Sequence, residues 1–539
     1  MYKLLLCWRY LLTRYIAFAS IVSVMLGVAT MIIVNAVMLG FTSEMQNRIH
    51  GILADVIFES RSMNGFPNTE WHRSLILETA GDLIEEMTPT VVVPAMLTVR
   101  TGLSGEPVSM PVELVGIDPK TKGRVTDTTK YLQHPENRAD LSFKLRDGGY
   151  DVQAAGLAKG GIYRFEMQYA GWEHRRFFFA EMEKERRRND NEQRRRKQQP
   201  NTPQASLAPR GEDGFDPLML PSQPPRNPFE DAPGAPVKVF DPSQEQHAGI
   251  ILGVGLCSHG RRYERPHPGT GEKMVVDTLA IIPGDDVMLT FPTADLPPKL
   301  QSDSFTVVDI YESKMVEYDS RLAYVPLEKL QQLRGMYDPA TDAPMVTQIL
   351  IKAKPGANIN ELRDRLQAVF PADLYIISTW RDKQESLLAA VFNELMILNV
   401  LLFLIFAVAG FGILAIFYMI VVEKTKDIGI LKSLGAGGGG IMQIFLYYSL
   451  LLGIVGAGSG LVLGLIFIRY IKEIAAALSI ILQHEVFDPA VYSFYEIPTI
   501  VQPWTVFWVI AGAVVIAVAS GILPAARAAR MHPVESLRS

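Results

Sequence analysis

The chain has 539 residues, of which 48% are hydrophobic and 20% are charged, and its formal net charge is −5. This slight negative charge gives no support to nucleic-acid binding, which favours a basic surface. The apolar residues are unevenly distributed, because strongly apolar runs near the N-terminus and in the C-terminal part flank a long polar region. This unevenness predicts a membrane protein with a large domain outside the membrane.

Four long runs without Lys, Arg, Asp or Glu make up the apolar part. Each is longer than the roughly 20 residues that cross a hydrocarbon core, so we expect four transmembrane helices. The first run is not typical of a cleaved signal peptide, because it exceeds the usual length of about 15 residues and Ala17 and Ala19 precede its apolar stretch. We expect it to be retained. The predicted helices cover 15–43, 387–422, 437–468 and 497–525.

The positive-inside rule predicts the orientation of these helices. The rule counts short loops only, and among these Lys and Arg concentrate in the N-terminal segment 1–14, the loop 423–436 and the tail 526–539, which share one side in a four-span topology. The loop 469–496, on the other side, contains Arg469 and Lys472 as its only Lys or Arg residues. We therefore expect both termini in the cytoplasm and the large domain outside. Cys7 and Cys257 then lie on opposite sides, so no structural disulfide is expected.

The outer domain, 44–386, is predicted to be mixed α/β. A charged and proline-rich insert at about 181–245 interrupts it, and this composition predicts a solvated helix that runs into a disordered loop. The arginine triplets 186–188 and 194–196 leave two interpretations open, either binding of anionic lipid or a partner, or a plain solvated insert. Five predicted strands cover 91–99, 108–115, 249–256, 286–291 and 305–311, and an amphipathic helix is predicted at 360–370.

The cytoplasmic loop between the second and third helices carries the clearest local signal. Ile428, Leu431 and Leu434 recur every three residues on one face of a short predicted helix, with Lys426 and Asp427 among the charges elsewhere and Gly435 as its C-terminal stop. A helix of two to three turns is unstable alone in water. We therefore expect its apolar stripe to dock either on another protein or against the membrane interface.

The third helix carries a small-residue pattern that permits close helix packing. Gly456, Gly460 and Gly464 recur every four residues, and Ala513, Ala517 and Gly521 repeat this spacing in the fourth helix.

No enzyme signature emerges from the sequence. The glycines of 437–440 and 269–271 are not followed by Lys-Ser/Thr in the frame of a nucleotide-binding loop, and His484-Glu485 lacks the second histidine of a zinc-binding helix. We expect no catalytic, cofactor-binding or metal-binding residue. Glu394 stands at the outer mouth of the second helix, either as an interfacial acid or in a substrate or proton role.

Several stretches together resemble a known family. The order of the parts, the loop 423–436 and the tail 524–538 resemble the permeases of the FtsX/MacB superfamily of ABC transporters. Within that superfamily the chain is most similar to the lipoprotein-releasing LolC/LolE permeases. The closer similarity lies in 37–41 running on to 48–49, in 249–253 with 284–285, in 305–310 with 317–320, in 379–382, and in 487–488 through 497–498.

The resemblance implies a permease in the bacterial inner membrane that acts with other proteins. Two copies or two paralogues pair, the loop 423–436 is a coupling helix seated on a separate ATPase subunit, and ATP and Mg²⁺ bind to that partner. In Lol-type permeases, acyl chains of lipoproteins enter an outward-opening cavity and pass to a periplasmic chaperone. The matching cavity positions are Val34, Val37, Met38 and Phe41 in the first helix and Leu395, Leu398, Leu402 and Phe403 in the second.

The resemblance also places a chaperone-contact hairpin at about 291–300, with Phe291, Leu296, Pro297 and Pro298 as candidate contacts. The alternative is a turn stiffened by proline, and each cavity position has the alternative of ordinary helix packing or lipid contact. Two other functional classes remain open. One is a MacB-like exporter or mechanotransmission permease for soluble cargo, and the other is an FtsX-like regulator of a cell-wall hydrolase that transports nothing.

Overall fold

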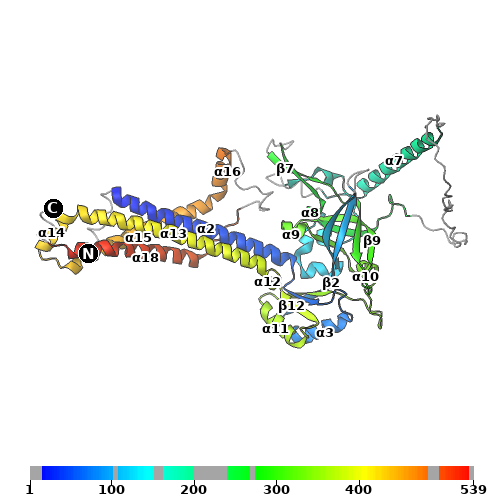
Figure 1. The fold of residues 1–539 in the computed structure, drawn as a ribbon, viewed down its shortest axis with the longest axis horizontal. Helices are drawn as coiled ribbons and strands as arrows, with labels where there is room; N and C mark the ends of the chain where they lie inside the picture. The colour runs from blue at the N-terminus through cyan, green and yellow to red at the C-terminus, as the bar shows by residue number, and fades with distance from the viewer. Residues whose placement is uncertain are drawn as a thin grey trace, which may run out of the picture.

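The molecule has two parts, with a bundle of long helices at one end and a mixed α/β domain at the other (Figure 1). The structure is a computed structural model that describes residues 15–100, 107–150, 162–198, 240–266, 273–482 and 497–532. The expected cytoplasmic N-terminus, most of the expected disordered insert, half of the expected outer loop and the end of the tail lie outside these residues, at 1–14, 199–239, 483–496 and 533–539.

The bundle consists of α2 (Tyr15–Ile52), α13 (Glu385–Glu423), α15 (Gly438–Arg469) and α18 (Pro503–Arg530). All four are long and apolar enough to cross a membrane. α15 packs against α2 and α18, and α13 packs against α18 and α2. Val28, Phe417 and Leu452 lie in the buried centre of the bundle, whereas many large apolar side chains on its outside are exposed. A surface of this kind is stable in lipid, because an apolar solvent does not penalise it.

Tertiary packing moves several helix ends away from their predicted positions. α2 continues past residue 43 to Ile52, because Glu44 and Arg48 form an ion pair of 3.0 Å one turn apart and Ile49 is fully buried. α13 likewise begins inside the α/β domain, at Glu385. α18 begins at Pro503 rather than at 497, since proline suits the first turn of a helix. Two shorter helices outside the domain are α14 (Thr425–Ser433) and α16 (Ile471–Leu482).

The α/β domain lies between α2 and α13 in the chain, as expected. In its described part, the main sheet has nine strands: β1 (Val56–Ser60), β2 (Ile84–Arg100), β3 (Pro107–Ile117), β5 (Ala248–Gly253), β8 (Asp286–Pro292), β9 (Leu300–Tyr311), β10 (Leu322–Pro326), β11 (Gln348–Ala353) and β12 (Tyr375–Thr379). The smaller sheet contains β4 (Ile162–Tyr163), β6 (Ser258–Pro266) and β7 (Lys273–Leu279). The helices are α3 (Thr69–Ala80), α4 (Pro119–Val125), η1 (Asp127–Tyr131), α5 (Pro135–Ala139), η2 (Phe165–Gln168), α7 (Trp172–Gln198), α8 (Val254–Cys257), α9 (Val316–Asp319), α10 (Leu327–Arg334), α11 (Ile359–Val369) and α12 (Trp380–Lys383).

These elements confirm the mixed α/β class of the domain. Four of the five predicted strands fall within β2, β3, β8 and β9, the fifth overlaps β5, and the predicted amphipathic helix overlaps α11. One predicted strand ends early, because the chain turns into α8 after Gly253. The backbone of Gly253 passes the carbonyl of Asp319 so closely that a Cβ there would collide with it. The chain therefore turns where a side chain has no room.

Part of the main sheet closes into a ring. The first half of β2 pairs with β11, and its later part pairs with β8, where Leu97 lies opposite Leu289. On its other side β2 pairs with β3, and the ladder continues through β10, β5 and β9 back to β8. β11, β1 and β12 extend the sheet beyond this ring. Side chains from the ring, including Leu114 and Val307, pack in the main hydrophobic core with the residues of the extension.

The charged start of the predicted insert forms the outer part of α7, which projects from the domain (Figure 1). Its base is fixed by Arg175, whose side chain is fully buried. The guanidinium donates to the Pro242 carbonyl at 2.7 Å and forms an ion pair with Asp286 at 2.6 Å. The two ends of the insert are thereby joined to β8, so the domain core is continuous across it.

Small residues set the spacing between α15 and α2. A Cβ on Gly456 would lie 2.7 Å from Cβ of Val24, and a Cβ on Gly460 would lie 2.8 Å from Cβ of Val28. Real Cβ atoms do not approach this closely, and neither neighbour is the mobile end of a side chain. Gly464 also faces α2, beside Ile32 at 3.4 Å. Gly458 points away from these contacts and has no neighbour within 4 Å.

Replacement of Gly456 by alanine is therefore expected to force α15 away from α2 and to destabilise the bundle by roughly 1–3 kcal/mol, as overpacking does. Thermal unfolding of the purified variant in detergent measures this as a midpoint several degrees below that of the parent chain. Gly458→Ala is the matched control, since it adds the same methyl group to the same helix in open space. Equal midpoints for the two variants would show that the glycine contact does not set the helix spacing.

Candidate functional site

α14 lies at the end of the bundle that is farthest from the α/β domain (Figure 1). Ile428 is buried against Ile441, Phe445 and the Ala525 region of α18. The Lys432 ammonium donates to the carbonyl of Ala529 at 2.8 Å and to that of Met531 at 2.5 Å. Both contacts hold α14 against the last turns of α18. They place a positive charge at the C-terminal end of α18, where free carbonyls favour it.

The three-residue stripe of α14 is thus divided between two environments. Ile428 is 3% exposed, whereas Leu431 is 39% and Leu434 is 80% exposed. Lys426 is also exposed, and Asp427 accepts a hydrogen bond from Lys424 at 2.6 Å. Gly435 follows in the left-handed conformation, with a φ of 93°, which ends the helix. Of this stripe, Ile428 packs against the rest of the chain and the two leucines stay uncovered.

The candidate cavity positions lie on neighbouring parts of α2 and α13. A Cβ on Gly27 would lie 3.6 Å from the ring of Phe406, which fixes the level at which these antiparallel helices meet. Counting from this contact, 34–41 of α2 lies at the level of 392–399 of α13, which includes Leu395 and Leu398. The six positions Val34, Val37, Met38, Phe41, Leu395 and Leu398 are half-buried.

The last two cavity candidates differ from one another. Leu402 is 7% exposed and lies inside the bundle, whereas Phe403 is 62% exposed on its surface. Glu394 is exposed among apolar neighbours on the same helix. α13 therefore presents a broad uncovered apolar face, which consists of Phe392, Met396, Ile397, Val400, Leu401, Phe403, Leu404, Ile405, Val408 and Phe411.

Near these positions, α2 also contacts the residues that precede α18, which lie far away in the sequence. The N–H of Ile500 donates to the Ala36 carbonyl at 2.9 Å, and the backbone of Pro498 passes directly over Gly40. Any side chain at position 40 would collide with that backbone. The segment before α18 is thereby seated on α2, beside the candidate cavity positions.

The hairpin between β8 and β9 contains one buried and three exposed candidate contacts. Leu296 is 89% exposed, and Pro297 and Pro298 are also exposed. Phe291 is fully buried in the main core, because it is an inward-facing residue of β8. The prediction that Phe291 contacts a chaperone is wrong, because a side chain without exposed surface cannot touch a partner. The exposed Leu300 lies at the end of the predicted hairpin 291–300, although it was not among the candidate contacts, and it completes the tip.

The base of this hairpin is held by Arg334, which is 2% exposed. Its guanidinium donates to the Pro292 carbonyl at 2.9 Å, and its own carbonyl accepts from the N–H of Ala294 at 2.8 Å. Burial lowers the pKa of Arg334 from its usual value. The exposed tip therefore projects from a fixed base.

Sequence reasoning also missed the junction that joins the domain to the bundle. Asp55 lies 2.5 Å from the imidazole of His50 through Oδ1, and its Oδ2 accepts from the N–H of Ala353 at 2.8 Å. Thr379 and Asp382 form a capping box that starts α12, immediately before α13. The spacing Thr-x-x-Asp was a readable signal for this cap. No local sequence pattern indicates the contact between Asp55 and Ala353, because these residues are distant in the sequence.

Comparisons with known proteins agree with this arrangement. Residues 399–533, which include part of α13 and all of α14, α15 and α18, match the FtsX-like permease C-terminal family. The lipoprotein-releasing system transmembrane protein LolC of Xylella fastidiosa is 28% identical over 266 residues, which are 48% of this chain and 62% of that protein. LolE of Haemophilus influenzae is 25% identical over 223 residues, 41% of this chain and 52% of that protein.

A macrolide export ATP-binding/permease protein, MacB of Neisseria meningitidis, is 30% identical over 130 residues, 24% of this chain and 17% of that protein. The matched regions thus cover less than two thirds of the length of each of these relatives. Among the described residues, no group of three or more His, Cys, Asp or Glu side chains could hold a metal ion. With four helices apolar enough to cross a membrane, an α/β domain between the first two and an FtsX-like C-terminal part, the chain is similar to the permeases of the FtsX/MacB superfamily, LolC and LolE among them.

Proposed function

We propose that the chain is the permease subunit of an ABC transporter that extracts lipoproteins from the outer leaflet of the bacterial inner membrane. In this proposal it pairs with a second permease, binds a separate ATPase subunit through α14, and passes the lipoprotein to a periplasmic chaperone. The termini face the cytoplasm and the α/β domain faces the periplasm. ATP and Mg²⁺ belong to the ATPase partner.

The observation that carries the proposal is the uncovered apolar surface of α14. Leu431 and Leu434 are exposed at the tip of the bundle, while Ile428 and Lys432 fix the helix to α15 and α18. A fixed helix with an unpaired apolar face suits a protein partner, because burial of these side chains on association is favourable. Force applied to α14 then reaches the bundle through buried contacts.

The exposed apolar face of α13 supports the lipid-related part of the proposal. Each acyl CH₂ that leaves a bilayer for water costs about 0.8 kcal/mol, so a lipoprotein anchor with two or three chains costs tens of kcal/mol. Extraction therefore needs an apolar surface along the whole path. Phe403 and its exposed neighbours offer such a surface at the level where α2 and α13 meet. At the other end of the path, Leu296 and Leu300 offer an apolar hairpin tip to a chaperone.

The similarity to MacB favours a second candidate, a mechanotransmission permease that acts on soluble cargo. This candidate shares the ATPase partner and the moving α/β domain. It differs in having no need for a lipid path along α13.

Reconstitution distinguishes the two functions. The chain, its ATPase and its partner permease are placed in vesicles that contain a fluorescent lipoprotein, and the chaperone is added outside. The expected result is ATP-dependent transfer of lipoprotein to the soluble chaperone, measured by its separation from the vesicles. Phe403→Asp is expected to abolish transfer, because a charge on the apolar path is costly to desolvate.

The control for this experiment is ATP hydrolysis, which the Phe403 variant should retain. Absence of transfer by the parent chain, with ATPase binding and hydrolysis intact, would contradict the lipoprotein function and leave the MacB-like candidate.

The role of α14 has a separate test. Leu431→Asp is expected to weaken association with the ATPase at least about tenfold, which is about 1.4 kcal/mol, because an apolar contact is replaced by a charge that must be desolvated. Co-purification with the tagged ATPase and titration of the complex measure the loss. Thermal stability should not change, since Leu431 makes no contribution to the buried cluster around Ile428.

Ile428→Ala is the contrasting variant. It removes a buried side chain and is expected to lower the stability of the bundle end by roughly 2–4 kcal/mol. Unchanged ATPase affinity in the Leu431 variant would mean that the uncovered leucines lie on the membrane instead.

A further inference from the structure

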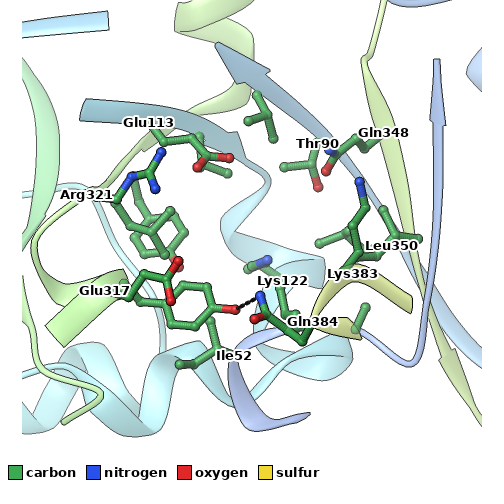
Figure 2. Close-up of a pocket in the computed structure, with 18 residues that line it drawn as sticks. Ile52, Thr90, Glu113, Lys122, Glu317, Arg321, Gln348, Leu350, Lys383 and Gln384 are labelled. Carbon is green, nitrogen blue, oxygen red and sulfur yellow. Dashed lines mark hydrogen bonds between the residues drawn. The ribbon is translucent and has the colours of Figure 1, made fainter. Parts of the chain in front are cut away.

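A cavity of about 240 Å³ lies where the domain meets the bundle (Figure 2). Its walls come from the end of α2, from β1, β2, β3, β10 and β11, from α4 and α9, and from Lys383 of α12 and Gln384, which precedes α13. Figure 2 shows Glu113, Arg321 and Glu317 on one side, Lys383 and Gln348 on the other, and Lys122 between them. The volume exceeds that of several water molecules at about 30 Å³ each. The cavity therefore has room for a small polar molecule.

Lys122 is the unusual member of this lining. It lies on α4, is 4% exposed, and within the described part of the chain its ammonium has no hydrogen-bond or ion-pair partner. Burial lowers the pKa of Lys122 to about 7. A lysine buried in this way normally has a carboxylate beside it, because an unpaired buried charge is costly. Glu113 and Glu317 line the same cavity but form no ion pair with it.

A second polar group in the lining is also without a partner. The hydroxyl of Thr90, which is 1% exposed, has no hydrogen bond in the described structure. By contrast, the hydroxyl of Thr88, two residues earlier in β2, forms a hydrogen bond with that of Thr121 at 2.7 Å. Two buried polar groups on different elements, α4 and β2, therefore lack partners and line one cavity.

We propose that this junction cavity binds a phosphate group, held by the Lys122 ammonium and the Thr90 hydroxyl. A phosphate oxygen accepts hydrogen bonds from both donor types, and its negative charge compensates the buried ammonium. Arg321 and Lys383 add positive charge around the cavity, and Lys383 is held by Glu59 at 2.7 Å. Glu113 and Glu317 face the cationic end of a zwitterionic phosphate ester.

A bound phosphate adds a link between elements that already meet at the junction. Gln384, at the start of α13, bonds to the hydroxyl of Tyr318 at 2.7 Å in the same cavity wall. The ligand thus lies between α4 and β2 of the domain and the segment that leads into the bundle. Two sources supply the same chemistry, namely a phospholipid headgroup and a free phosphate ester or ion.

Binding is tested by calorimetry on the full chain in detergent, with inorganic phosphate and glycerophosphoethanolamine as probes. Saturable one-site binding at pH 6.5 is expected, and Lys122→Met should weaken it at least tenfold. Lys120→Gln is the matched control, because Lys120 is an exposed lysine of the same helix and should leave affinity unchanged. Tighter binding of glycerophosphoethanolamine identifies a lipid headgroup as the source, and equal or tighter binding of inorganic phosphate identifies a free anion.

The dependence on pH gives an independent readout. Glycerophosphoethanolamine is a phosphate diester, and its phosphate keeps one negative charge between about pH 6 and 9. Its affinity for the cavity should therefore fall as pH rises above about 7, where Lys122 without ligand loses its proton. The other groups that face Lys122 are Glu113, Glu317, Arg321, Lys383 and the phenols of Tyr318 and Tyr324.

The proposal is overturned if neither probe binds saturably, or if Lys122→Met binds both as well as the parent chain. The methionine variant retains the volume of the side chain and removes a buried charge, so its melting temperature should equal or exceed that of the parent. That measurement separates lost binding from lost folding.

Discussion

The attachment of α2 to the sheet through Asp55 is the contact on which the two-part architecture depends. Its carboxylate binds His50 of α2 and the backbone of Ala353 in β11, and its carbonyl accepts from the N–H of Trp380 at 3.2 Å. One residue therefore joins the end of α2, the main sheet and the start of α12. Because α12 leads directly into α13, the two helices that connect the domain with the bundle are fixed at the same point.

The bundle and the α/β domain each contain an element that a few buried contacts fix while its other face stays uncovered. At one end, Ile428 and Lys432 hold α14 while Leu431 and Leu434 remain exposed. At the other end of the molecule, Arg334 holds the hairpin whose tip carries Leu296 and Leu300. The glycine contacts between α15 and α2 lie between these two elements and bring the helices into direct backbone contact. The uncovered surfaces are thus supported by rigid parts of the fold.

The sequence was sufficient to predict the four long apolar helices and the class of the domain, because uncharged runs and alternating strands are local patterns. It could not predict where helices end, since Ile52 at the end of α2 packs in a core of domain residues and Pro498 is seated on Gly40 from far along the chain. The sequence also could not show which residue of the apolar stripe of α14 is buried, because nothing local distinguishes Ile428 from Leu431. Lys122 belongs to a polar segment that is typical of a surface helix, and only the packing of α4 against β2 and β11 buries it.

The closed ring of strands has a mechanical consequence. In a ring the strands from β2 through β8 have their pairing partners on both sides, so bending this part of the domain requires the loss of ladder hydrogen bonds. If α2 or α13 is displaced, this part of the domain would therefore turn as a stiff body about the Asp55 joint and not bend. Rotation enlarges displacement in proportion to distance from the pivot, so the outer end of α7, which projects away from the bundle in Figure 1, sweeps a wider arc than the helix ends that drive it.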